Sequence, residues 1–293
     1  MTFRPLFARL GLLLALPASG LAQPAAQRDG TTASLRFAHT MESSLENVPG
    51  GEVSVTSLEF AARASASLGA STQLLFGITA AQHELDLRGP AVLPARLQSV
   101  GLPVGVMQRV NDTWRWSVML QPRFAGAPEV GDGGFDLPVM AFASYRMSPE
   151  LTWTFGLRYS ARSSIEVLPI IGFTWKFDPA WEARIAFPET GVYYRPSPTL
   201  TLAGIVELQG GDYRLERDPR PLGARPGGSL DDSWLEYREI RAGLSAQHEL
   251  ASGVTLRGDA GYAFSQRFEY ERLDLEVEGE GAPYIALSLV ARF

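Results

Sequence analysis

The sequence has 293 residues, of which 45% are hydrophobic, and it carries a formal net charge of −6, no cysteine and three histidines. The absence of cysteine excludes disulfides, thiol catalysis and thiolate metal sites. The acidic balance argues against nucleic-acid binding, and the three histidines are widely separated, with no zinc-binding H-E-x-x-H pattern. No cofactor is indicated.

The N-terminus has the features of a secretory signal peptide. Arg4 and Arg9 provide positive charge, and the apolar segment 10–16 is too short to span a bilayer as a helix. Small residues suit cleavage after Ala22. We therefore expect three parts of the chain: a signal peptide at 1–22, a periplasmic segment at 23–32 and a β-barrel at 33–293.

The remainder of the chain alternates between apolar and polar residues. From Trp114, every second residue is mostly apolar and the interleaved set, beginning with Arg115, is mostly polar. The same alternation runs through residues 151–160, 167–177 and 254–265. Successive strand side chains point to opposite faces, so each segment is a strand with one apolar face. Segments much longer than the usual soluble strand of about 5–6 residues, with full charges on the polar face, predict a membrane barrel.

Short turns and long loops alternate along the chain. The short turns are expected at 67–71, 111–113, 148–150, 178–180, 197–198 and 251–253, and the long loops at 41–52, 87–95, 125–136, 218–232 and 273–281. This asymmetry is typical of periplasmic turns and extracellular loops. We predict an all-β fold, a single antiparallel up-and-down transmembrane β-barrel of about 14 strands, with 12 as the alternative. The uncertain pair is the short hairpin 181–195.

Aromatic residues and the last strand support the membrane assignment. Six aromatic residues near strand ends are expected in interfacial girdles: Trp114, Trp153, Trp175, Phe177, Trp181 and Trp234. The last strand has apolar residues at alternate positions up to a terminal aromatic residue, namely Ile285, Leu287, Leu289, Ala291 and Phe293. This pattern resembles the insertion signal read by the barrel assembly machinery.

The segment 169–194 is similar to a known family. The runs Pro169–Phe173, Trp175–Phe177 and Phe187–Tyr194, with Pro179 and Trp181 between them, resemble a family of bacterial outer-membrane β-barrel proteins of unknown function. The likeness is concentrated in residues 165–215. It implies the fold and the location, and it implies no activity.

The polar faces of the strands would line the lumen. Their candidate residues are Arg63, Arg115, Arg123, Arg146, Arg158, Lys176, Arg184, Glu207, Glu239, Arg241, Arg257, Asp259 and Arg267. An excess of arginine in an open lumen would favour anions. Alternatively, these residues pair across strands and fill a small barrel, as the neighbours Glu239 and Arg241 suggest. The sequence leaves both interpretations open.

The leading functional hypothesis is an outer-membrane channel or transporter for small polar or anionic solutes. The alternative is a structural or surface-interaction barrel with a filled lumen, and the third is a lipid- or peptide-modifying enzyme. No G-x-S-x-G motif occurs, and no catalytic residue or metal ligand is predicted. The expected partners are outer-membrane lipid, lipopolysaccharide and the barrel assembly machinery. We expect a monomer, and the long basic loop 218–228 is a candidate contact with lipopolysaccharide phosphates.

Overall fold

The computed structural model describes residues 30–46, 48–90, 92–131, 133–220, 228–272 and 275–293. The expected signal peptide at 1–22 and residues 23–29 of the expected periplasmic segment lie outside these ranges. The remaining residues of that segment, 30–32, already belong to the first strand. No helix in the described ranges is long and apolar enough to cross a membrane.

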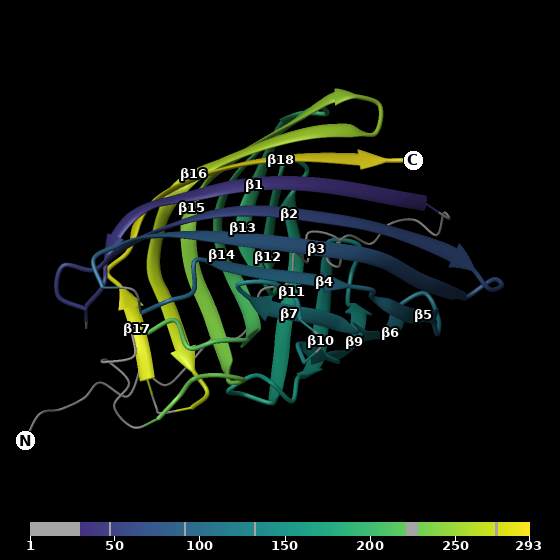
Figure 1. Cartoon of the computed structure of the whole chain (residues 1–293). Helices are drawn as coiled ribbons and strands as arrows, with labels where there is room; N and C mark the ends of the chain where they lie inside the picture. Colours follow the sequence, from purple (N-terminus) through teal and green to yellow (C-terminus); the bar gives the residue numbers. More distant parts are fainter. Residues whose placement is uncertain (1–29, 47, 91, 132, 221–227, 273–274) are drawn as a thin grey trace, which may run out of the picture.

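The described chain consists of strands joined by turns and loops (Figure 1). The strands are β1 (Gly30–Ser44), β2 (Glu52–Ser67), β3 (Thr72–Arg88), β4 (Arg96–Gly101), β5 (Val104–Arg109), β6 (Trp114–Leu120), β7 (Arg123–Ala127), β8 (Phe135–Asp136), β9 (Val139–Arg146), β10 (Leu151–Tyr159), β11 (Val167–Asp178), β12 (Trp181–Ile185), β13 (Glu189–Ser197), β14 (Leu200–Leu215), β15 (Trp234–Ala251), β16 (Val254–Tyr270), β17 (Leu275–Gly279) and β18 (Ala282–Arg292).

These strands form a closed antiparallel barrel. β4 and β5 both pair with β3, and β17 and β18 both pair with β16, so each couple is one wall strand with a break. The couples β6/β7 and β8/β9 are interrupted in the same way. The wall therefore has 14 strands, and β1 closes it by pairing with both β2 and β18. The prediction of fourteen strands is confirmed, and the short hairpin β12–β13 is part of the wall.

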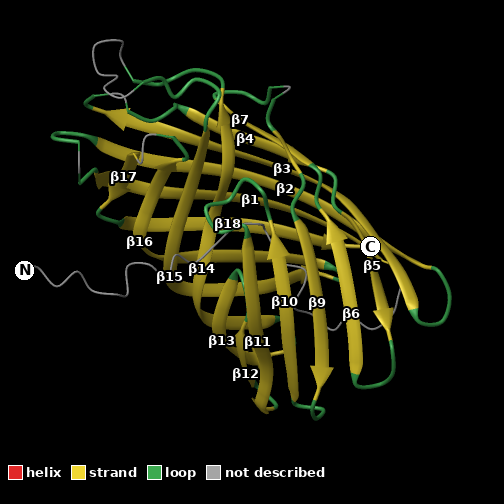
Figure 2. Cartoon of the chain, turned by 90° about the horizontal axis from the view of Figure 1, so that it is seen from below, coloured by secondary structure: helices red, strands yellow, loops and turns green. Residues whose placement is uncertain are grey.

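All six predicted short turns lie at one end of the barrel, which we call the turn end. The long connections lie at the opposite end, the loop end (Figure 2). The turns form because their residues bond to their own backbone: Asn111 Oδ1, for example, accepts the amide hydrogens of Thr113 and Trp114. Both described chain ends, Gly30 and Phe293, lie at the turn end, joined by Thr31 and Phe293 backbone hydrogen bonds.

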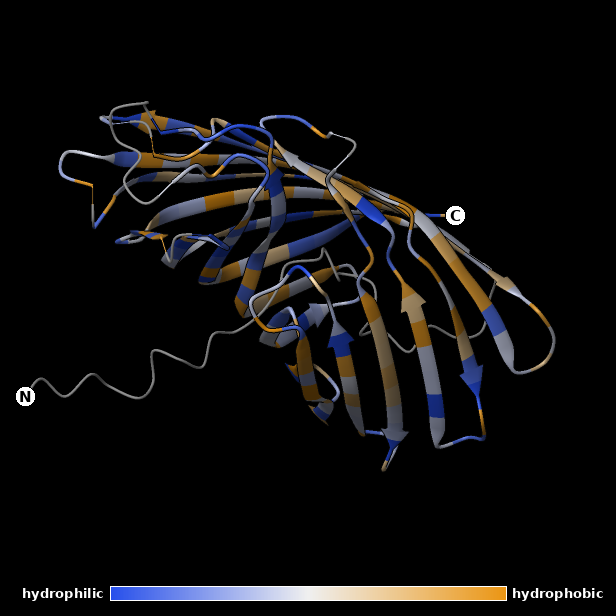
Figure 3. Cartoon of the chain, turned by 60° about the horizontal axis from the view of Figure 1, so that its bottom comes forward, coloured by the Kyte–Doolittle hydropathy of each residue, from blue (hydrophilic) through white to orange (hydrophobic). Residues whose placement is uncertain are grey.

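The outer surface is apolar, and apolar and polar residues alternate along the strands (Figure 3). Ile285, Leu287 and Leu289 on β18 are 44–53% exposed, which places the predicted assembly-signal face outward. An aromatic belt lies at the turn end on β6 and β9–β12, where rings of five of the six predicted girdle residues stack or tilt against one another or against nearby aromatic rings. The sixth, Trp234, instead lies buried at the loop end under Arg162, whose guanidinium carbon is 5.2 Å from the ring centroid.

The outer half of β14 separates from β13 beyond Glu207 and turns into the lumen together with the outer half of β15, which stays paired with β16. In a wall strand one face is exposed, but residues Leu208–Tyr213 and Trp234–Glu239 are buried on both faces. The bend occurs at Gly210, whose φ of +128° is in the range that favours glycine. A Cβ at this position would lie 1.9 Å from the carbonyl oxygen of Tyr237, so only glycine allows the two strands to pair here.

The inward hairpin reaches the opposite wall. Arg214 and Leu215 of β14 pair in parallel with Gly126 and Ala127 of β7, and the amide of Glu216 donates to Ala127 O at 3.1 Å. We call this contact the β7–β14 junction. It closes a smaller ring at the loop end, formed by β14–β17, β1–β4 and β7.

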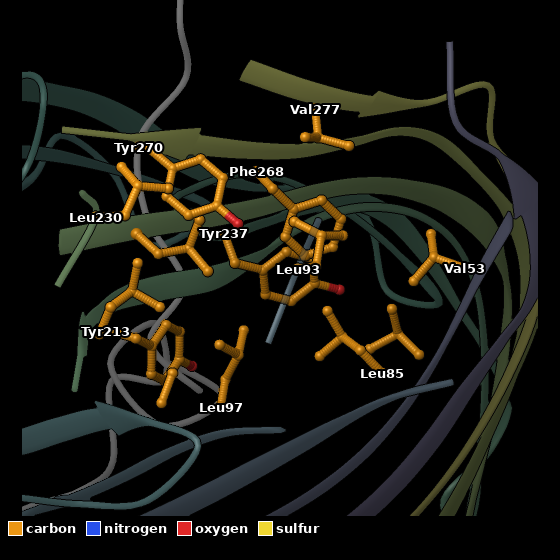
Figure 4. Packing of buried hydrophobic residues seen from close by; sticks show 14 of the residues in the cluster. Val53, Leu85, Leu93, Leu97, Tyr213, Leu230, Tyr237, Phe268, Tyr270 and Val277 are labelled. Carbon is orange, nitrogen blue, oxygen red and sulfur yellow. The ribbon is translucent and has the colours of Figure 1, made fainter. Parts of the chain in front are cut away.

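The smaller ring encloses an apolar core (Figure 4). Its members come from strands on all sides of the ring and from the loops over it: Leu45, Val48, Val53, Val55, Leu85, Leu93, Leu97, Ala125, Ala127, Tyr213, Leu215, Leu230, Leu235, Tyr237, Phe268, Tyr270 and Val277. Tyr237 stacks on Phe268 with ring centroids 4.9 Å apart. This core closes the lumen at the loop end, because close-packed apolar side chains exclude water.

Candidate functional site

Below the apolar core, the middle of the lumen is a layer of charged side chains that pair across the barrel. Arg36 of β1 donates two hydrogen bonds to Glu207 of β14, at 2.5 and 2.7 Å. Arg257 binds Glu189 at 2.6 Å and Asp259 at 2.7 Å. β1 and β14, and likewise β16 and β13, are not neighbours in the wall, so the Arg36–Glu207 and Arg257–Glu189 ion pairs join separate parts of the lumen wall, whereas Arg257 and Asp259 lie on the same strand.

The most buried pair is Glu239 with Arg241, both of which have completely buried side chains. The Glu239 carboxylate also accepts hydrogen bonds from Thr40, Tyr237 and Gln266 at 2.8–3.0 Å. A buried ion pair is stabilising only when such extra hydrogen bonds satisfy it. The pairing of Glu239 with Arg241 and of Arg257 with Asp259 therefore agrees with the alternative interpretation of the sequence, in which charged residues pair and fill the lumen.

A second polar cluster lies on the other face of the inward hairpin. Arg123 of β7 binds both Asp136 at 2.8 Å and Asp212 of β14 at 2.9 Å. Arg158 is 1% exposed, and its Nε and Nη1 have no hydrogen-bond partner among the described residues. Ser160 donates a long hydrogen bond of 3.5 Å to Asp136. The cluster thus links the inward hairpin to the wall strands β7–β10.

The structure places the thirteen lumen candidates in four groups. Seven face inward and form ion pairs: Arg123, Arg184, Glu207, Glu239, Arg241, Arg257 and Asp259. Arg158 faces inward in the second cluster. Four face inward towards the turn end: Arg63, Arg115, Arg146 and Lys176. Arg267 faces outward.

Arg267 is a correction to the sequence analysis. The register of β15 against β16 shifts by one residue between Ala263 and Ser265. Beyond this bulge the inward residues are Gln266 and Phe268, both completely buried, so Arg267 lies on the outer face, where it pairs with Glu276 and Glu278. A one-residue shift exchanges the two faces of a strand.

The lumen wall also contains inward residues that were not predicted from the sequence. Arg36 and Arg109 fit the same alternation, since Leu35 and Phe37 on either side of Arg36 face outward. Asp136 and Asp212 had no usable signal, because they lie in a broken strand and beyond the bend at Gly210. Arg109 matters most: it faces Arg115 across β5 and β6.

Arg109, Arg115 and Arg146 form a cationic group at the turn end of the lumen. Arg115 lies close enough to the other two for mutual repulsion. No hydrogen bond or ion pair joins Arg115 or Arg146 to a carboxylate among the described residues, although Asp112 and Glu150 lie in the adjacent turns. Arg115 and Arg146 thus differ from most arginines in the middle of the lumen, which form ion pairs with carboxylates.

A hollow lies between the charged layer and the apolar core. Its volume is about 50 Å³, enough for a few water molecules, which need roughly 10–15 Å³ each. Its wall includes Glu59, His83, Arg123, Gln209 and Tyr213.

A buried serine–histidine pair lies beside the hollow. Ser57 Oγ is 2.7 Å from His83 Nδ1, but the two residues are only 1% and 3% exposed. The His83 ring packs edge-on against Tyr213 and Tyr237 of the apolar core. The pair is buried in this conformation. No group of three His, Cys, Asp or Glu residues in the described ranges could hold a metal ion.

Known proteins of similar shape are outer-membrane barrels. An outer-membrane channel from Pseudomonas putida F1 superposes with a TM-score of 0.51 and 11% identity, over 92% of this chain and 97% of the other. A shortened variant (deltaS2S3) of the monoaromatic hydrocarbon channel TodX, a protein of Pseudomonas putida, superposes with a TM-score of 0.51 and 8% identity, over 92% and 91% of the chains. At these identities the likeness shows the fold alone. No curated protein matches the sequence. Residues 67–277 match the model of a family described as a domain of unknown function, DUF6268.

Proposed function

The chain belongs to the DUF6268 family of outer-membrane-type β-barrels, and from this premise we propose that it is an outer-membrane channel for small polar solutes, closed in the conformation described. The loop end would face the cell exterior and the turn end the periplasm. The apolar outer face, the aromatic belt at the turn end and the signal-peptide features support this location.

The β7–β14 junction is the observation that carries the proposal. This junction is additional to the strand pairings of the wall. All wall pairings, from β1 round to β18, remain if the junction separates. Two backbone residue pairs and the buried Arg123–Asp212 ion pair join β7 to β14 among the described residues. This junction is short relative to the ladder between β14 and β15, which extends over the whole of β14.

The cationic group Arg109, Arg115 and Arg146 supports a preference for anionic solutes. Like charges on one face attract an anion into the lumen and lower the barrier for its passage. The ion pairs in the middle of the lumen supply no such preference, because each guanidinium there is matched by carboxylates.

A reversible lock tests the proposal. The chain has no cysteine, so the double variant Ala127→Cys/Leu215→Cys can form only the bond across the β7–β14 junction. Strand spacing of about 4.8 Å is compatible with a disulfide. We expect single-channel recordings in planar bilayers to show openings of the wild type, silence of the oxidised double variant, and recovery after reduction. Each single cysteine variant, treated identically, is the control.

Two results would count against the proposal. If the oxidised variant conducts like the wild type, then the solute path does not cross the junction. If the folded wild type is silent at all voltages, the barrel is structural, with a filled lumen. The paired charges of the middle layer favour this second function.

A further inference from the structure

Glu59 on β2 is a buried carboxylate that the charged layer does not use. Its side chain lines the hollow below the apolar core, and the residue is only 9% exposed. No hydrogen bond or ion pair to Glu59 occurs within the described part of the chain. Arg36 and Arg241 are close enough to attract it, but each is bonded to another carboxylate.

The charges around the hollow do not balance. The linked layer holds three guanidiniums, Arg36, Arg241 and Arg257, and five carboxylates, Glu59, Glu189, Glu207, Glu239 and Asp259. Arg63 lies four residues from Glu59 on the same face of β2. Including it in the count still leaves one more carboxylate than guanidinium. A buried charge without a counter-charge is costly. The excess falls on Glu59, since the other four carboxylates have ion-pair partners.

The rest of the wall includes residues with oxygen acceptors. Thr79, Ser99, Tyr213 and Gln209 line the hollow, and Gln209 Oε1 has no hydrogen-bond partner in the described residues. Arg123 also lines it, but its guanidinium is paired with Asp136 and Asp212. Oxygen acceptors around one carboxylate suit a hard monovalent cation or an ammonium group. The volume of about 50 Å³ limits the guest to a few heavy atoms.

We propose that the hollow beside Glu59 binds a small monovalent cation, with the Glu59 carboxylate as its counter-charge. The cation is either an alkali ion or the ammonium group of a small amine, because both present one compact positive charge. This inference does not require that the barrel conducts, because binding is measured on the closed protein in detergent.

Calorimetric titration of the refolded barrel tests the proposal with three chloride salts at constant ionic strength. We expect methylammonium or potassium to bind with one site per chain, and tetramethylammonium, which is too large for the hollow, to show no binding. Heat from both small cations identifies an alkali-ion site that tolerates amines. Heat from methylammonium alone identifies a site for the ammonium group, which donates hydrogen bonds.

Glu59→Gln keeps the shape of the side chain and removes its charge, so we expect binding to fall at least tenfold. Glu84→Gln is the matched control, because Glu84 lies on the adjacent strand β3, is exposed, and pairs with Arg96 outside the hollow. Thermal unfolding of each variant, with and without the cation, provides a second measurement: the midpoint should rise for wild type and Glu84→Gln only. The proposal is overturned if neither small cation binds the wild type, or if Glu59→Gln binds as well as Glu84→Gln.

Discussion

Replacing Gly210 by alanine should open the channel by loosening the inward hairpin. The alanine must adopt a φ near +128°, a conformation that costs a non-glycine residue about 1–3 kcal/mol. Its Cβ would lie 1.9 Å from the carbonyl oxygen of Tyr237, so β15 must move by at least about 1 Å to restore a normal contact of 3.0 Å or more. That movement weakens one or two backbone hydrogen bonds, at about 0.5–1.5 kcal/mol each.

Together these terms add about 1.5–6 kcal/mol to the free energy of the closed conformation, in which the hairpin is bent. Each 1.4 kcal/mol changes an equilibrium tenfold, so a difference of only 2–3 kcal/mol between the closed and open states would raise the open probability by about 30- to 150-fold. Single-channel recording measures this probability directly.

Gly204→Ala is the control, because Gly204 lies on the same strand and has open space where a Cβ would be added. We expect it to conduct like the wild type. Equal open probabilities and equal thermal stabilities for Gly210→Ala and Gly204→Ala would refute the assignment of Gly210 as the bend that seats the hairpin.

Three further predictions concern single charges. Arg36→Met leaves Glu207 buried without its partner and should destabilise the barrel by about 3–5 kcal/mol in guanidinium unfolding, whereas Arg36→Met with Glu207→Gln should recover most of this loss. Hydrogen bonds from the Arg220 guanidinium hold the pKa of Asp218 well below its usual range. The stabilisation of that loop by this contact should therefore be complete above about pH 4 and be lost as the pH falls towards the depressed pKa. Hydrogen exchange of the loop amides measures this loss, and Arg220→Ala, which lacks the contact, is the comparison. Arg267→Gln should change unfolding by less than about 1 kcal/mol, because this partly exposed residue pairs outside the barrel; a loss of several kcal/mol would place it in the lumen after all.

The regular parts of the wall could be predicted from sequence because strand periodicity is local. In a regular strand, successive side chains point to opposite faces. Since Trp114 faces outward, for example, Arg115 must face the lumen. Contacts between residues far apart in the sequence do not change such a prediction. The strand number, the turns and most inward residues therefore follow from the alternation alone.

The inward hairpin could not be predicted, because the contacts that position it are not local in the sequence. The bend at Gly210 depends on the partner carbonyl of Tyr237, and the shift beyond Ala263 depends on the register with β15. Both faces of the segment Leu208–Tyr213 are buried, and it mixes apolar, polar and glycine residues. Its sequence therefore lacks the two-residue alternation that identifies a wall strand. The two adjacent glycines, Gly210 and Gly211, were the available signal for a departure from the wall.

The β7–β14 junction also bears on how the molecule is assembled. Arg123 and Asp212, which meet beside it, are 89 residues apart in the chain, whereas wall hairpins join strands separated by a few residues. Contacts with long sequence separation carry a greater loop-closure entropy. The contact that closes the wall has an even longer separation, since Thr32 of β1 pairs with Arg292 of β18. The β14–β15 hairpin joins consecutive strands, so its own ladder does not have to wait for either of these contacts. The barrel is therefore sealed only when two distant pairings are complete, that of β1 with β18 and that of β7 with β14.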